Sequence, residues 1–143
     1  MLVKELMSPD PAFCTPQTTL HDVARLMVEN DCGAIPVCDG QHVVGIVTDR
    51  DIVTRGLARD LDPNTVAVSE VMTRNLMIVH DDDPLERALQ IMESEQVRRL
   101  PVVQGPALVG VLSMTDLAEH LSERKAGELL REVSEPPRRK RAH

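Results

Sequence analysis

Aromatic residues are almost absent from this chain. Its 143 residues include one phenylalanine and neither tyrosine nor tryptophan, so the core has to be built from smaller aliphatic side chains and methionine. The same shortage argues against binding of single-stranded nucleic acid by base stacking, which needs exposed aromatic platforms. Hydrophobic residues make up 42% of the sequence, an ordinary share for a globular protein. The length fits one domain or two tightly coupled half-domains.

Long apolar runs and catalytic or metal-binding motifs are also missing. No stretch approaches the length needed to span a bilayer, and the N-terminus is polar within a few residues, so we expect a cytoplasmic protein with neither signal peptide nor membrane partner. The five histidines and three cysteines show no paired metal-ligand spacing, which predicts no metal site. The chain carries neither a P-loop nor a nucleophile–base motif, so it is not expected to be an enzyme.

The cysteines leave two interpretations open. In a reducing cytosol Cys14, Cys32 and Cys38 are expected to be small buried side chains. Cys14 and Cys38 each end a predicted strand, however, and if those strands are neighbours, the two thiols can approach disulfide distance.

The charge of the chain is acidic and unevenly distributed. The net charge is −7, although residues 138–141 add four positive charges, so the remainder is more acidic still. A negatively charged protein surface repels the phosphate backbone of nucleic acid, so nucleic acid is not an expected partner. The basic run is expected to be a solvated, disordered tail; the alternative is that it contacts nucleic acid by itself.

The sequence is a duplication. Val3, Met27 and Asp51 correspond to Val68, Met92 and Asp116, always at an offset of 65 residues and without a gap. This period is longer than those of solenoid proteins, so each repeat is a complete supersecondary unit used twice. Two such units each expose an apolar face, and packing them together buries both.

Both repeats show the same order of predicted elements, strand–helix–strand–strand–helix, which favours an α+β fold. A short apolar stretch at 12–14 or 77–79 precedes a helix that begins near Thr18 or Thr19 in the first repeat and at Asp83 in the second. A hairpin follows at 34–47 and 100–112, with turns at Asp39-Gly40 and at Gln104-Gly105-Pro106. Second helices are predicted at about 49–59 and 115–121.

These motifs resemble the cystathionine β-synthase (CBS) domain, and the chain resembles a stand-alone pair of such domains, a Bateman module. The most specific segments are GIVTDRD at 45–51 and VRRLPV at 97–102. The linker LDPNT at 61–65 and the short chain are similar to small bacterial CBS-pair proteins of the hypoxic-response type. We predict a first CBS domain at 1–60, a linker at 61–67, a second CBS domain at 68–122, and a C-terminal helix with the basic tail at 123–143.

The resemblance implies a fold and a function. Two β-α-β-β-α domains would pack with pseudo-two-fold symmetry, and two chains would associate into a homodimer. The family implies a regulatory module with no required cofactor, which senses AMP, ADP, ATP or S-adenosylmethionine in clefts between the repeats and signals to an effector protein. The alternative is a ligand-free dimeric scaffold or stress-response adaptor whose clefts are empty.

Two short motifs are the main candidates for ligand contact. Thr48-x-x-Asp51 and Ser113-x-x-Asp116 lie where a strand leads into a helix. The [ST]-x-x-[DE] pattern is a helix capping box, worth about 1 kcal/mol, and this explanation alone accounts for it. In the family, however, the hydroxyl and the carboxylate contact phosphate and ribose, and both roles are compatible.

The remaining candidate contacts follow from the family pattern. The strand segments that would line adenine can equally be core, and the arginines that would hold phosphate can equally be solvated surface. The phosphate candidates of the two repeats are not equivalent, because Arg50 and Arg55 of the first repeat become Thr115 and His120 in the second. The predicted contacts besides the two motifs are Cys14, Thr15, Ile35, Pro36, Val37, Arg50, His80, Arg99, Leu100, Pro101 and Val102, with Arg55 and Arg98 as further phosphate candidates.

Overall fold

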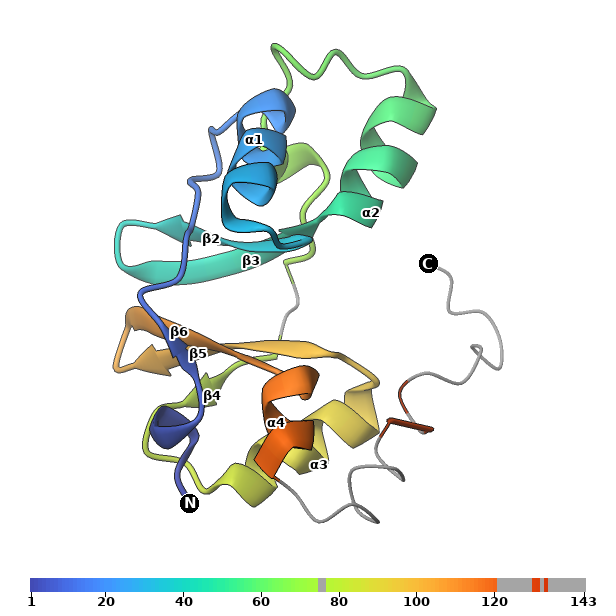
Figure 1. The fold of residues 1–143 in the computed structure, drawn as a ribbon. Helices are drawn as coiled ribbons and strands as arrows, with labels where there is room; N and C mark the ends of the chain where they lie inside the picture. Colours follow the sequence, from blue (N-terminus) through green and yellow to red (C-terminus); the bar gives the residue numbers. More distant parts are fainter. Residues whose placement is uncertain (75–76, 121–129, 132, 134–143) are drawn as a thin grey trace. The chain divides into compact units, whose positions relative to one another are not determined.

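The computed structural model describes residues 1–74, 77–120, 130, 131 and 133, and divides the chain into two compact units. Unit 1 comprises Met1–Pro9, Met77–Gln104 and Val109–His143, and unit 2 comprises Asp10–Leu76 and Gly105–Leu108. Apart from the three isolated positions, the predicted C-terminal helix and basic tail lie outside the described residues. The mixture of helices and strands in each unit confirms the α+β class (Figure 1).

Unit 2 is built on a hairpin with a helix over it. Its elements are α1 (Leu20–Asn30), β2 (Ala34–Asp39), β3 (His42–Thr48), α2 (Asp49–Asp51), the π-helical segment η2 (Ile52–Gly56), and the 3-10 turns η3 (Leu57–Arg59) and η4 (Val68–Glu70). The predicted helix at 49–59 is therefore continuous, but its middle is π-helical and its end is a 3-10 turn. Apolar residues at helical spacing on α1, such as Leu20 and Val23, face a core that also holds Ile35, Val37 and Val47.

Unit 1 repeats this plan around a fuller sheet. Its elements are η1 (Val3–Glu5), β1 (Ser8–Pro9), β4 (Val79–His80), α3 (Leu85–Glu95), β5 (Arg99–Gln104), β6 (Ala107–Ser113) and α4 (Met114–His120). The sheet order is β1-β6-β5-β4, with β4 parallel to β5 and the other pairs antiparallel. Helices α3 and α4 lie on one face of this sheet (Figure 1).

Local sequence signals account for the helix starts and turns, with one correction. Thr19 caps α1, and its hydroxyl accepts the Asp22 N–H at 3.2 Å. In the second repeat Pro84, not Asp83, occupies the cap position; the Asp83 carboxylate instead accepts the His80 N–H at 2.9 Å. Both hairpins close with a glycine at positive φ, Gly40 at 64° and Gly105 at 61°, as two-residue turns of this kind require.

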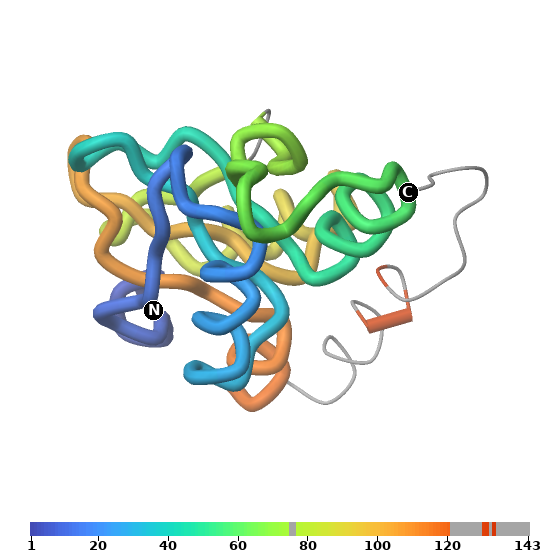
Figure 2. Tube along the Cα trace, turned by 90° about the horizontal axis from the view of Figure 1, so that it is seen from above, coloured from blue at the N-terminus to red at the C-terminus, as the bar shows by residue number. Residues whose placement is uncertain are grey.

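The first residues of each repeat pack in the unit that contains the hairpin of the other repeat. Val3 is fully buried in the core of unit 1, and Ser8–Pro9 extends its sheet beside β6, as Figure 2 shows for the N-terminal segment. Val68 is fully buried in the core of unit 2, where Thr73 exchanges two backbone hydrogen bonds with Ile46, at 2.9 and 3.0 Å. The compact units therefore combine residues from both sequence repeats.

The segment with Ser8–Pro9 and the segment with Thr73 each pass very close to a glycine of the neighbouring strand. A Cβ atom at Gly45 would lie 2.8 Å from the carbonyl oxygen of Thr73, and one at Gly110 would lie 2.9 Å from that of Ser8. These glycines in the strand interior therefore allow close approach of another backbone.

Replacing Gly45 with alanine is expected to lower the free energy of unfolding by about 1–3 kcal/mol, because the new methyl group meets backbone that has to move. Gly40→Asn is the matched control: it has no atom within 4 Å of its added Cβ, and asparagine tolerates positive φ. Urea unfolding followed by circular dichroism measures the free energy of unfolding of both variants. Equal stability of the two variants would contradict the close approach of Thr73.

Candidate functional site

The Thr48 and Asp51 side chains form a reciprocal pair at the junction of β3 and α2. The Thr48 hydroxyl accepts the Asp51 N–H at 3.1 Å, and Asp51 Oδ2 accepts the Thr48 N–H at 3.0 Å. The Asp51 side chain retains 13% exposure, so its carboxylate is sheltered but accessible. The predicted capping box is thus present, and it holds a hydroxyl and a carboxylate together in fixed geometry.

The second repeat carries the same pair in a looser form. The Ser113 hydroxyl accepts the Asp116 N–H at 3.1 Å, and Asp116 Oδ2 lies 3.4 Å from the Ser113 N–H that it accepts. Both side chains are partly buried. A duplicated sequence has therefore placed a hydroxyl–carboxylate pair at the same junction of each unit.

Backbone pairing brings the other predicted residues of the first repeat to the same sheet. Ala34 pairs with Thr48 across the hairpin, so Ile35 is one residue from the capping box. Cys14 forms a parallel bridge to Val37, with Cys14 N–H donating to the Pro36 carbonyl at 3.0 Å. Thr15 follows at the exposed end of this bridge, where its N–H donates to the Thr18 hydroxyl at 3.0 Å.

The aliphatic side chains proposed to face adenine are core residues. Ile35 and Val37 are 1% and 0% exposed and belong to the core cluster of unit 2. Leu100 and Val102 are fully buried in the corresponding cluster of unit 1. A ligand beside these strands would thus meet backbone groups and the buried Pro36 or Pro101 at the sheet, with the aliphatic side chains serving as support.

The candidate arginines differ in what they contact. Arg55 contacts residues of both repeats within unit 2: its Nε is 3.9 Å from Asp51 Oδ1, and its guanidinium donates to the Val71 carbonyl at 3.2 Å. The spacing of four residues between Asp51 and Arg55 allows this pair on any helical turn, and this signal in the sequence was missed. Arg50 and Arg99 have exposed side chains, as expected for residues that would reach a phosphate in solvent.

His80 is placed by the acidic turn that follows it. Its ring Nδ1 lies 3.7 Å from Asp83 Oδ2, and the same oxygen is 3.6 Å from the Arg87 guanidinium. The imidazole is exposed at the end of β4, next to Val102 and Val103 of the parallel strand β5. The structure therefore places His80 beside the predicted strand segment of the second repeat.

The cysteines are free thiols in this structure, and the disulfide alternative is not realised. Cys14 and Cys38 are buried neighbours: the Cys38 N–H donates to the Cys14 carbonyl at 2.8 Å. Burial, with a smaller contribution from the nearby Cys38, raises the pKa of the Cys14 thiol to about 12. Burial also raises the pKa of Cys38. Both groups are therefore protonated and unreactive at neutral pH.

The described part of the chain has neither a cluster of metal-ligating side chains nor a membrane-spanning helix. Within residues 1–74, 77–120, 130, 131 and 133, no three His, Cys, Asp or Glu side chains are grouped as ligands of a metal ion. Among the same residues, no helix combines the length and the apolar character needed to cross a membrane.

Comparison with known proteins places these features in a family. The model of the CBS domain matches the chain twice, at residues 3–57 and 68–123. Hypoxic response protein 1 of Mycobacterium tuberculosis is 35% identical over 134 residues, which cover 93% of this chain and 94% of that protein. A crystal structure of Hypoxic Response Protein I with two coordinated zinc ions has a TM-score of 0.78 and 37% identity, covering 85% of this chain and 99% of that one.

Two further solved structures contain adenosine compounds. CBSX2 in complex with AMP has a TM-score of 0.73 and 28% identity, covering 87% of this chain and 98% of that one. The CBS domain pair of protein MJ0100, in complex with 5′-methylthioadenosine and S-adenosylmethionine, has a TM-score of 0.75 and 25% identity over the same shares. With two family matches along its length, this chain belongs to the CBS domain family and carries a tandem pair of CBS domains.

Proposed function

We propose that this protein is a regulatory module that binds AMP, ADP, ATP or S-adenosylmethionine and signals to an effector protein. The observation that carries the proposal is the duplicated hydroxyl–carboxylate pair, Thr48 with Asp51 and Ser113 with Asp116, held by reciprocal hydrogen bonds. A carboxylate can accept both hydroxyls of a ribose at once, and a fixed threonine or serine hydroxyl can donate to a phosphate. Structural relatives that hold AMP or S-adenosylmethionine support this chemistry.

The surroundings of each pair suit a nucleoside. In unit 2 the strand segment with Ile35 and Pro36 adjoins the Thr48 pair, and exposed Arg50 is a candidate for a phosphate contact. In unit 1 the Met114 N–H, next to Ser113, donates to the carbonyl of Arg98 at 2.8 Å, so the segment that leads into Leu100 and Pro101 starts beside the Ser113 pair. Exposed Arg99 is the phosphate candidate there. Because the chain supplies no aromatic stacking partner apart from one phenylalanine, adenine would be held by aliphatic contact and backbone hydrogen bonds.

The mechanism is a population shift. A ligand changes the balance between conformations only through its different affinity for them, and the favoured conformation is then read by the effector. We propose that this occurs in the cytoplasm and in a homodimer, and that the role is regulatory, not catalytic.

A thermal-shift panel with AMP, ADP, ATP and S-adenosylmethionine tests the proposal. A ligand present at 100 times its dissociation constant should add about 2.7 kcal/mol to the free energy of unfolding. Guanosine monophosphate is the matched control, because it keeps ribose and phosphate but changes the base. No stabilisation by any of the four compounds would contradict the proposal and favour the ligand-free scaffold or stress-response adaptor.

A further inference from the structure

The Arg55 side chain joins the first hydroxyl–carboxylate pair to a segment of the second repeat. Its Nε lies 3.9 Å from Asp51 Oδ1, and its guanidinium donates to the Val71 carbonyl at 3.2 Å. Val71 belongs to the second repeat in sequence, but it is 1% exposed in the core cluster of unit 2. One side chain therefore links the proposed ribose acceptor to residues 68–73.

The contacts of Asp51 leave capacity for a ligand. Its Oδ2 accepts the Thr48 N–H at 3.0 Å, and its Oδ1 faces Arg55. An ionised carboxylate has about four lone-pair sites, so each oxygen can accept one further hydrogen bond. The side chain keeps 13% exposure, so a ligand can reach these sites from solvent. Donors beside both oxygens thus orient the carboxylate without saturating it.

The helical segment that carries Arg55 is irregular. The segment η2 is π-helical over Ile52–Gly56, and the Leu57 N–H donates to the carbonyl of Ile52, five residues earlier. Such turns are rare and are frequently found at functional sites. The matching helix of the second repeat, α4, is α-helical over Met114–His120. The irregular turn is therefore specific to the repeat in which an arginine follows the aspartate.

The second repeat lacks the arginine contact. At the offset of 65 residues Arg55 becomes His120, which forms no hydrogen bond or ion pair with any residue that the structure describes. The bond from the Ser113 N–H to Asp116 Oδ2 is 3.4 Å long, compared with 3.0 Å for its counterpart at Asp51. The capping box that lies beside a guanidinium is thus the tighter of the two.

We propose that Arg55 is a positioning residue of the first ligand site and not a phosphate contact. It holds the Asp51 carboxylate in the orientation that accepts both ribose hydroxyls, and it transmits occupancy of this site to residues 68–73 through the Val71 carbonyl. The inference rests on the proposed function and deepens it, because it makes the two sites unequal: the first binds ribose more tightly than the second.

Calorimetry with adenosine, AMP and ATP separates positioning from phosphate contact. A chain that carries Asp116→Ala isolates the first site for this measurement. In that background Arg55→Met should weaken the binding of all three compounds by a similar factor, about three- to fivefold, because they share the ribose. A phosphate contact would leave adenosine unaffected and give a loss that grows with the number of phosphates. That pattern would overturn the proposal.

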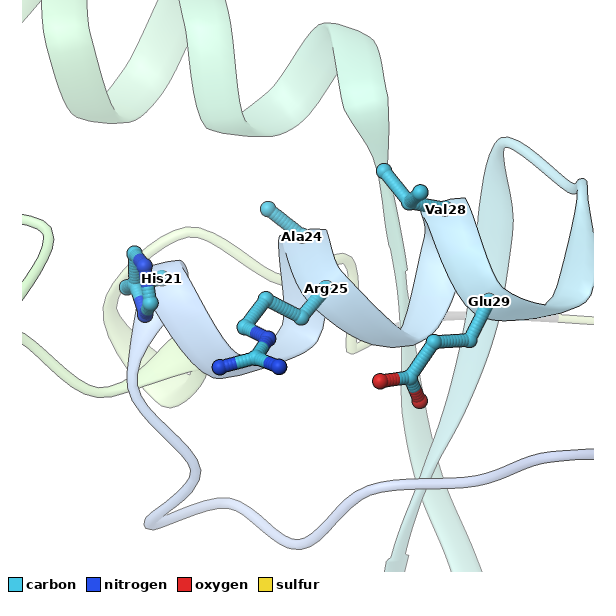
Figure 3. A pocket seen from close by; sticks show the side chains of 5 residues that line it. All are labelled: His21, Ala24, Arg25, Val28 and Glu29. Atoms are coloured by element: carbon cyan, nitrogen blue, oxygen red, sulfur yellow. The ribbon is translucent and has the colours of Figure 1, made fainter.

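Two variants control for the loss of charge. Arg55→Lys keeps a positive charge beside Asp51 and should recover part of the affinity, because lysine supplies a point charge without the fork of donors. Arg25→Met removes the same charge from unit 2 and should bind all three compounds normally. Figure 3 shows the Arg25 side chain on the surface of α1, beside an open groove of about 330 Å³ that is also lined by His21, Ala24, Val28 and Glu29. Equal losses in Arg25→Met and Arg55→Met would show a general charge effect and overturn the positioning role.

Hydrogen exchange followed by mass spectrometry tests the link to the second repeat. Saturating AMP should increase the protection of residues 68–73 in the parent chain, and Arg55→Met should abolish this increase even at saturation. An unchanged increase in Arg55→Met would overturn the link. A parent chain that binds no nucleoside would refute the proposed function itself, whereas normal binding by both the parent and Arg55→Met would overturn the role of Arg55 alone.

Discussion

Asp51→Ala is expected to abolish nucleotide binding at the first repeat while leaving the second intact, and Asp116→Ala is expected to do the reverse. The carboxylate would accept both ribose hydroxyls, and a hydrogen bond to a charged group contributes about 1.5–3 kcal/mol, or roughly 10- to 150-fold in affinity. Isothermal titration calorimetry of the full chain with AMP and ATP measures the loss as a change in stoichiometry. The same two residues hold capping boxes, so some loss of stability, about 1 kcal/mol, accompanies each change.

Asp51→Asn separates these two effects. Its amide oxygen still accepts the Thr48 N–H, which Asp51 Oδ2 accepts at 3.0 Å, so the cap is kept while the charge is lost. Asp49→Ala removes a neighbouring exposed carboxylate that accepts the Arg50 N–H at 2.8 Å, and this variant should bind nucleotide normally. Unchanged affinity and stoichiometry in both Asp51→Ala and Asp116→Ala would refute the assignment of the ligand contacts.

Val3→Asp is expected to destabilise unit 1, although Val3 belongs to the first repeat. The side chain is fully buried in the core cluster that contains Leu85, Met92 and Leu100. A buried carboxylate without a partner costs about 3–5 kcal/mol, a large part of the 5–15 kcal/mol that stabilises a typical domain. Hydrogen exchange followed by mass spectrometry should show lost protection in α3 and β5 but not in α1 and β2.

Lys4→Asp is the control for this change, because the Lys4 side chain is exposed and only its backbone N–H is bonded, to the Asp81 carbonyl at 2.9 Å. It should leave the exchange pattern unaltered. Loss of protection in α1 and β2 upon Val3→Asp would contradict the placement of the first residues in unit 1. Val68→Asp should instead reduce protection in α1 and β2 but not in α3 and β5, because Val68 is fully buried in unit 2.

Much of the local structure was predictable because short-range signals produce it. Thr19 before an apolar stripe predicts the start of α1, and glycine in the hairpin turns predicts the positive φ of Gly40 and Gly105. The capping boxes at Thr48 and Ser113 were found from residues three apart, and their hydrogen bonds are present. The Asp83-Pro84 helix start was misplaced by one residue because the Asp83 carboxylate has a competing acceptor role toward His80.

The sequence by itself determined the duplication, the α+β order of elements and the matched hydroxyl–carboxylate pairs, since each depends on residues close together in the chain. Only the tertiary structure decided which hairpin the short segments at Ser8–Pro9 and Thr73 would join, because two or fewer paired residues have too little local preference to choose a sheet edge. It also decided that Arg55 turns toward Asp51 and the Val71 carbonyl, and that Val28 stays in solvent while Ile35 is buried. Burial and long-range hydrogen bonds depend on neighbours distant in the sequence, which periodicity does not encode.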